Sequence, residues 1–163
     1  MTAATSNVEW LDQDQQHAWR AYLVGTTLLM DRLDRELREG HDLSLPEYEI
    51  MVRLSEAPGR RLRMAVLADS LSHSRSRVTH TVSRMQRAGL VLRDACESDG
   101  RGVEAVLTAA GARALERAAV THVRGVRALL LDLASPEDFA AVGRVFDAVT
   151  DKLVDTNPAA DIR

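Results

Sequence analysis

Apolar residues recur every three or four positions along most of the chain, which is the spacing of amphipathic helices. The first such pattern runs from Trp10 to Gly40, and the glycine is expected to end the helix. Its apolar stripe is broad and comprises Ala18, Trp19, Tyr22, Leu23, Leu28, Leu29, Leu33 and Leu37. A small domain cannot cover so broad a stripe on so long a helix, so the pattern predicts packing against a second chain.

Three shorter helices are predicted in the middle of the chain. The first covers 46–56 and is stopped by Ala57-Pro58-Gly59, the second covers 64–70, and the third opens at Ser74 and ends at Gly89. Their expected inward residues are Ile50, Met51 and Leu54, then Val66, Leu67 and Leu71, and finally Val78, Val82 and Met85. Two short helices joined by a tight turn, the second with a polar outer face, match the helix-turn-helix plan.

A β-hairpin is predicted after the third short helix. Leu90–Leu92 and Val103–Leu107 are typical of strands, and Ser98-Asp99-Gly100 is typical of the turn between them. Leu62 is expected in a short edge strand that precedes the helix-turn-helix. The predicted fold class is therefore mainly α with a small β-hairpin.

Two further helices are predicted after the hairpin, over 108–134 and from Ser135-Pro136 onward. Ser135 is the expected N-cap of the last helix, and the proline suits its first position. The apolar residues of that helix follow steps of three and four, at Phe139, Val142, Phe146, Val149 and Leu153. This heptad-like seam again indicates a partner helix.

The distribution of charge, rather than its total, indicates the kind of partner. The chain has 163 residues and a formal net charge of −3, which alone argues against nucleic acid. Between Arg60 and Arg101, however, nine arginines stand against four acids, so this segment carries +5 and the remainder −8. The basic segment can attract phosphate while the acidic remainder limits non-specific binding.

The third short helix concentrates the candidate DNA contacts on an outer face without acids. Arg75 and Arg77 lie in its first turn, where arginine can pair with guanine in the major groove. Arg77 has an alternative as an ion-pair partner of Asp69 or Asp94. The other candidates are Ser76, Thr79 and His80, short enough to reach bases or phosphates, and Arg84 and Arg87, placed to contact phosphate. The plain alternative is a solvated helix face.

The hairpin carries a second set of candidate contacts. Arg101 at its tip suits a narrow A·T-rich minor groove, where the negative potential is enhanced. Asp99 is acidic, so bracing the hairpin is a better role for it than touching phosphate. Phosphate contacts are also expected from Arg60, Arg61 and Arg63, for which an exposed linker is the alternative.

In their order, these elements resemble the MarR family of winged-helix transcription regulators over Trp10 to Val154. The similarity lies in LSLPEYEIMVRLSEAPGRRLRMAVLADSL, SRSRVTHTVSRMQRAGLV and SDGRGVEAVLTAAG. The last contains the family's wing signature at Asp99, Arg101, Leu107, Thr108 and Gly111. The resemblance implies an obligate homodimer with interleaved terminal helices. It also implies a pseudo-palindromic double-stranded DNA operator, with one recognition helix per half-site and the wing arginine in the minor groove.

The resemblance also implies a domain plan and an effector. Residues 10–42 and 109–155 would form the dimerisation helices, 43–108 the winged helix-turn-helix domain, and 1–9 and 156–163 flexible ends. A small ligand, often a phenolic or other aromatic acid, commonly releases the DNA in this family. Trp19, Tyr22 and His41 are the candidate ligand contacts, although a dimer core is the simpler role for Trp19 and Tyr22. The expected function is a dimeric transcription regulator, most simply a repressor.

Other functions find little support in the sequence. It has no nucleophile–base arrangement, phosphate-cradling glycine loop or paired-carboxylate motif, so no enzyme is expected. The histidines lack metal-ligand spacing, so neither a metal site nor a cofactor is expected. The competing class is a helical interaction protein or enzyme subunit whose basic helix is only solvated surface.

The single cysteine, Cys96, excludes an intrachain disulfide and fits a reducing cytoplasm. It is either a tolerated thiol on the hairpin or a redox sensor. No apolar run is long enough to span a bilayer, and the N-terminus lacks the basic region and apolar core of a signal peptide. The expected location is cytoplasmic, with no membrane partner.

Overall fold

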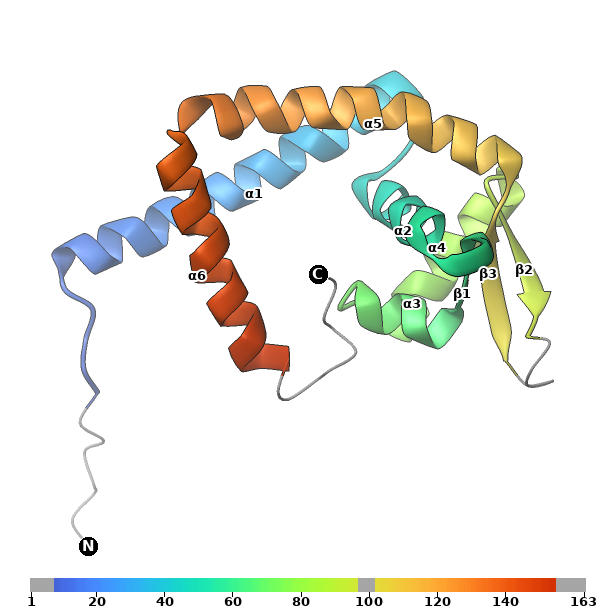
Figure 1. Cartoon of the computed structure of the whole chain (residues 1–163), viewed down its shortest axis with the longest axis horizontal. Helices are drawn as coiled ribbons and strands as arrows, with labels where there is room; N and C mark the ends of the chain where they lie inside the picture. The colour runs from blue at the N-terminus through green and yellow to red at the C-terminus, as the bar shows by residue number, and fades with distance from the viewer. Residues whose placement is uncertain (1–7, 97–101, 155–163) are drawn as a thin grey trace, which may run out of the picture.

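The computed structural model describes residues 8–96 and 102–154. Its elements are α1 (Gln13–His41), α2 (Leu45–Glu56), η1 (Pro58–Arg60), β1 (Arg61–Arg63), α3 (Met64–Ser70), α4 (Arg75–Arg87), β2 (Val91–Ala95), β3 (Val103–Leu107), α5 (Ala109–Leu129), η2 (Leu131–Leu133) and α6 (Pro136–Val154). In Figure 1, α1 and α5 run side by side, a lobe of α2–α4 and the sheet lies at one end, and α6 turns away at the other. This arrangement confirms the predicted mainly α fold with a small sheet.

The ends of α1 differ from the prediction. The helix begins at Gln13, because the Asp12 carboxylate accepts a 2.8 Å hydrogen bond from the Gln15 backbone N–H and caps it. It also continues past Gly40 to His41. Asp42 takes the left-handed conformation at φ 55°, so it ends the helix in place of the predicted glycine. Short polar side chains tolerate this backbone region better than most.

The lobe has a continuous apolar core formed by α2, α3, α4 and the sheet. The fully buried large side chains of this core are Leu37 of α1 and, within the lobe, Ile50, Met51, Leu54, Leu67, Val78, Val82, Met85 and Val91. The prediction that Val66 faces inward is wrong, because its side chain is 48% exposed. Met64 packs against the core with Leu67 and Ala68 instead, since these positions share one side of the short α3.

The sheet has three antiparallel strands in the order β1-β3-β2. Leu62 pairs with Ala105, which confirms the predicted edge strand. Strand β2 begins one residue later than predicted and continues to Ala95, opposite Val103. Beyond it, the Cys96 backbone N–H donates to the Gly102 carbonyl at 2.9 Å. This bond extends the pairing of the hairpin by one step toward its tip.

Helix α5 is anchored to the wing at its first turn. The Thr108 hydroxyl accepts a 2.9 Å bond from the Gly111 N–H and donates to the Gly89 carbonyl at 2.8 Å. Gly111 is buried so closely that an added Cβ would lie 2.1 Å from the Leu90 carbonyl oxygen. The helix ends at Leu129, earlier than predicted, because Leu130 leaves helical geometry at φ −138° and a short 3-10 turn follows.

Substituting Gly111 by Ala is therefore expected to destabilise the protein by about 3 kcal/mol, at the upper end for overpacking. The clash is with a backbone carbonyl, which cannot move without shifting the strand and α5 apart. Thermal unfolding would measure the loss. Gly40→Ala is the matched control, because nothing lies within 4 Å of its added Cβ. A Gly111→Ala variant as stable as Gly40→Ala would contradict the packing.

Candidate nucleic-acid interface

Helix α4 is built with one buried side and one exposed side. Ser74 caps it, since its hydroxyl accepts a hydrogen bond from the Arg77 backbone N–H at 3.3 Å. Gly89 follows the helix with φ 72°, the left-handed conformation that glycine adopts without steric cost. Val78, Val82 and Met85 face the core, whereas the exposed residues include Arg75, Ser76, Arg77, Thr79 and His80. The face chosen from the sequence is therefore open to a partner.

A hollow of about 300 Å³ lies between α3, α4 and the first residues of β3, near the tip of the wing. It brings together residues far apart in the chain: Arg63, Met64, Ala65, Arg75, Thr79, Gly102 and Val103. Three of the predicted contacts with DNA, Arg63, Arg75 and Thr79, therefore border the same depression. Gly102 directly follows Arg101, but Arg101 and Asp99 lie outside the described residues, as do 1–7 and 156–163 of the predicted flexible ends.

Arg77 and its surroundings favour an outward role. Within the described part of the chain, neither Asp69 nor Asp94 forms an ion pair with Arg77, and Arg77 is exposed. His73, in the turn before α4, lies close enough to Arg77 for the charge of the guanidinium to affect the pKa of the histidine. Burial, helped by that charge, lowers the pKa of His73, so this turn gains no positive charge at neutral pH.

Two of the predicted contacts lie elsewhere and have protein partners. The Arg84 guanidinium donates to the Glu47 carboxylate at 2.7 Å, away from the hollow. Arg61 pairs with Glu104 at 3.3 Å across the sheet, so it braces the wing. The Cys96 thiol also lies 3.4 Å from Glu104 and is buried. Sequence reasoning missed Glu104 and Glu47, because a single acid in a strand or helix carries no periodic signal.

Comparison with known proteins agrees with this geometry. A sequence profile of the MarR family matches residues 41–102. The HTH-type transcriptional repressor Rv2887 of Mycobacterium tuberculosis is 36% identical over 112 residues, which are 68% of this chain and 75% of the relative. This chain belongs to the MarR family of transcription regulators. Membership also confirms that it is a regulator and not an enzyme.

Solved MarR structures share the whole fold. Sco3205 of Streptomyces coelicolor, crystallised in complex with DNA, has 38% identity and a TM-score of 0.87, covering 91% of this chain and 92% of that one. AbsC from the same organism has 39% identity and a TM-score of 0.84, covering 90% of this chain and 98% of its own. Within this winged-helix fold, α3 and α4 form the helix-turn-helix and the β2–β3 hairpin is the wing.

A second site in this MarR chain is an apolar cavity of about 210 Å³ between α1, α2 and α5. Its lining residues are Leu29, Met30, Leu33, Leu45, Tyr48, Glu49, His122, Val126 and Leu130. The His122 ring lies 4.6 Å from that of Tyr48, and its buried Nδ1 has no hydrogen-bond partner among the described residues. Burial lowers the pKa of His122 and raises the pKa values of Tyr48 and Glu49. The cavity therefore favours neutral groups.

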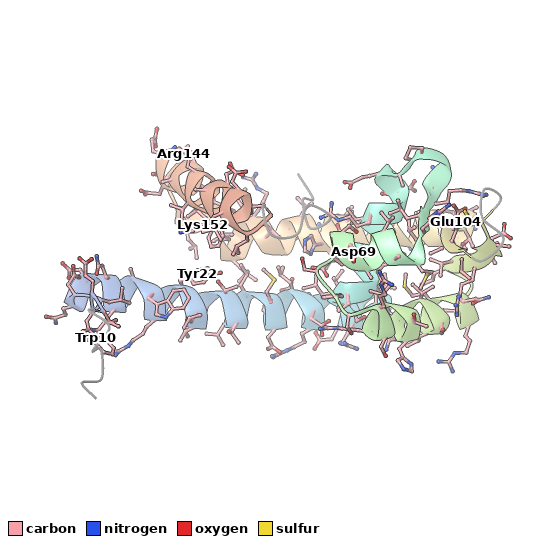
Figure 2. All side chains as sticks on the ribbon, turned by 90° about the horizontal axis from the view of Figure 1, so that it is seen from below. Trp10, Tyr22, Asp69, Glu104, Arg144 and Lys152 are labelled. Carbon is pink, nitrogen blue, oxygen red and sulfur yellow. The ribbon has the colours of Figure 1, made fainter. Side chains whose placement is uncertain are left out.

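The three predicted ligand contacts do not meet in one place. Trp19 stacks on Tyr22 with 5.6 Å between ring centroids, and Tyr22 lies 5.3 Å from Phe146 of α6. Figure 2 shows Tyr22 pointing from α1 toward α6. His41 accepts or donates a 2.7 Å bond with Thr121 near the other end of α1. At 1.5 Å per helical residue, Tyr22 and His41 are roughly 28 Å apart, beyond the reach of one small ligand.

The burial of His122 predicts a pH dependence of stability. The pKa of a histidine in the unfolded chain is about 6.5, and its value in the folded protein is lowered here. Above pH 6.5 the histidine is neutral in both states, so it does not reduce the free energy of unfolding. Stability is then lost as the pH falls through the folded value, because the unfolded chain takes up the proton first. The fall in Tm between pH 7.5 and 5.0 should be smaller in His122→Gln than in the wild type. His17→Gln, exposed on α1, is the control, and equal slopes in both variants would contradict this role.

The remaining feature is a large exposed apolar surface away from the lobe. Its side chains come from α1, α5 and α6, the long helices outside the lobe, whose places are seen in Figure 1. The exposed members include Trp19, Leu23, Leu28, Val120, Val123, Phe139, Val142, Val145, Phe146, Val149 and Leu153. Large exposed apolar patches usually mark a protein interface. Among the described residues, no helix is both long and apolar enough to cross a membrane, and no three potential ligand side chains gather to hold a metal.

Proposed function

We propose that this protein is a homodimeric repressor that binds a pseudo-palindromic double-stranded DNA operator. The observation that carries the proposal is the exposed, acid-free outer face of α4, with Arg63 and Arg75 bordering one hollow beside the wing. Such a face meets the two demands of DNA recognition. Cations neutralise phosphates, and side chains in the first turns of the helix reach base edges.

Each contact has a separate physical role in this proposal. Arg75 and Arg77, in the first turn of α4, read bases in the major groove, with Ser76, Thr79 and His80 beside them. Arg63 neutralises a phosphate next to the hollow. Arg101 enters the adjacent minor groove, and Asp99 braces the wing from within, as the wing signature implies.

The dimer follows from the exposed apolar surface on the helices outside the lobe. In Figure 1 these helices project away from α4, so a second copy can cover them without blocking the DNA-binding face. A two-fold dimer places its two recognition helices on one side of the duplex. Half-sites should then lie about 10 bp apart, one helical turn.

The proposed effector site is the apolar cavity between α1, α2 and α5. A phenolic or other aromatic acid would place its ring against the apolar wall and a hydroxyl or protonated acid group near His122 Nδ1. A carboxylate would meet the nearby Glu49, whose raised pKa favours its neutral form. A ligand that prefers a lobe arrangement other than the DNA-competent one shifts the population away from DNA.

Selection of bound duplexes from a random pool tests the function directly. The expected product is an inverted repeat with half-sites about one helical turn apart. The logarithm of the binding constant should fall steeply and linearly with the logarithm of the salt concentration, because each phosphate contact releases counterions. If no sequence were enriched, and if the remaining weak binding did not depend on salt concentration, the alternative of a helical interaction protein would be favoured.

A further inference from the structure

A polar cluster joins the recognition helix to the start of α2. One Glu47 oxygen accepts from Arg84 Nε at 2.7 Å, and the other accepts from the Ser44 N–H at 2.8 Å and the Ser44 hydroxyl at 2.6 Å. Arg84 also donates to the Ser44 hydroxyl at 3.3 Å. These bonds connect positions 37 and 40 residues apart, so they tie two separate helices together.

The cluster is buried at its acidic centre. Glu47 is 7% exposed and Ser44 is 2% exposed, although the Arg84 side chain itself is 55% exposed. Burial alone would raise the pKa of Glu47, but the hydrogen bonds from Arg84 and Ser44 outweigh it and hold the pKa below its ordinary value. A buried carboxylate that loses its hydrogen-bonded ion-pair partner is strongly destabilised. Arg84 therefore cannot turn toward a phosphate without a large penalty at Glu47.

The first turn of α2, which contains Glu47, is also attached to α1. The Leu45 N–H donates to Asp34 of α1 at 2.7 Å, and Asp34 in turn pairs with Arg38 at 2.6 Å. Leu45 and Tyr48, on neighbouring positions of this turn, line the apolar cavity. The first turn of α2 thus touches α1, the cavity and the recognition helix at once.

We propose that Arg84 and Glu47 are positioning residues for DNA recognition, which hold α4 at the angle set by α1 and the first turn of α2. Arg84 acts on the operator through Glu47 and Ser44, not by contacting phosphate. The proposal rests on the proposed function, since it assigns a role within DNA binding. It also makes the first turn of α2 the route by which a change at the cavity reaches α4.

Operator affinity measured over a series of salt concentrations tests the pair. Glu47→Gln and Arg84→Gln should each weaken binding about tenfold or more, and the double variant should bind no more weakly than the poorer single one, since both remove one interaction. The salt slope should stay at the wild-type value in all three. The Glu47→Gln result is the most telling, because losing an acid should otherwise strengthen DNA binding.

A phosphate contact from Arg84 predicts a different pattern. Arg84→Gln would then reduce the salt slope by about 0.9 per protomer, and Glu47→Gln would bind as tightly as the wild type or tighter. Either result would overturn the positioning role while leaving the proposed function intact. A wild-type protein that enriches no duplex would instead overturn both.

Two further variants control for charge and folding. Glu56→Gln makes the same charge change on α2, where Glu56 is 63% exposed and 3.6 Å from Arg53, and should leave affinity unchanged. Ser44→Ala removes one hydroxyl from the cluster and keeps both charges. It should weaken binding with an unchanged salt slope, even if the charge variants fold poorly in thermal unfolding. Wild-type affinity in a folded Ser44→Ala protein would count against the proposal.

Discussion

Replacing Arg75 by Ala is expected to weaken operator binding at least about 30-fold. A bidentate arginine–guanine pair contributes about 1–3 kcal/mol of discrimination, and a symmetric dimer makes the contact twice. Arg75 is suited to such a pair because it opens the exposed first turn of α4 and borders the hollow beside the wing. Gel-shift titration of the selected operator at one fixed salt concentration would measure the loss, and preference for one base pair per half-site should relax with it.

Arg144→Ala is the matched control for this experiment. It removes the same charge from α6, and Figure 2 shows Arg144 on that helix, at the far end of the molecule from the wing residue Glu104. Its effect on operator affinity should be small, since the charge is distant and screened by salt. If Arg75→Ala bound the operator as well as Arg144→Ala, α4 would not be reading bases through this residue.

Placing aspartates at Val142 and Val149 is expected to produce a monomer that no longer binds the operator. Both side chains lie on the exposed seam of α6, at 45% and 43% exposure. Burying an unpaired carboxylate in an apolar interface costs several kcal/mol, and the dimer contains each site twice. A monomer offers one recognition helix, so it loses the second half-site. Light scattering at micromolar concentration would report the mass, and gel shift the affinity.

Ala140→Asp provides the comparison, because position 140 is exposed on the side of α6 opposite the seam. This variant should remain a dimer and bind DNA as the wild type does. A dimer mass for the seam variant would show that α6 is not part of the interface. A monomeric wild-type protein would contradict the dimer altogether.

Local signals were sufficient to predict most of the secondary structure. Helix α3 begins and ends where its pattern indicated, and so does β3. The caps at Ser74 and Ser135 were also correctly chosen. These features depend on residues three or four apart, so the information lies within each segment. The wrong placement of Val66 arose because a seven-residue helix is too short for its apolar residues to define one side.

The partners of the charged side chains were not predictable in the same way. Arg75 and Arg84 are both arginines of α4, and the sequence does not tell their surroundings apart. Arg75 borders an open hollow, whereas Arg84 is bound to Glu47. Likewise, the apolar α1 pattern did not separate Leu33 and Leu37, which are buried within the chain, from Trp19 and Leu28, which remain exposed.

The amino-acid sequence by itself determined the order of helices and strands, the family, and which face of α4 is exposed, because periodicity, caps and a local excess of arginine are properties of neighbouring residues. Only the tertiary structure decided that Arg84 is bound to Glu47 while Arg75 borders a hollow, where an apolar cavity opens beside His122, and how α1 is tied to α4 through α2. Those outcomes depend on which distant segments come into contact, and the energy of a charge depends on that contact more than on its place in the chain.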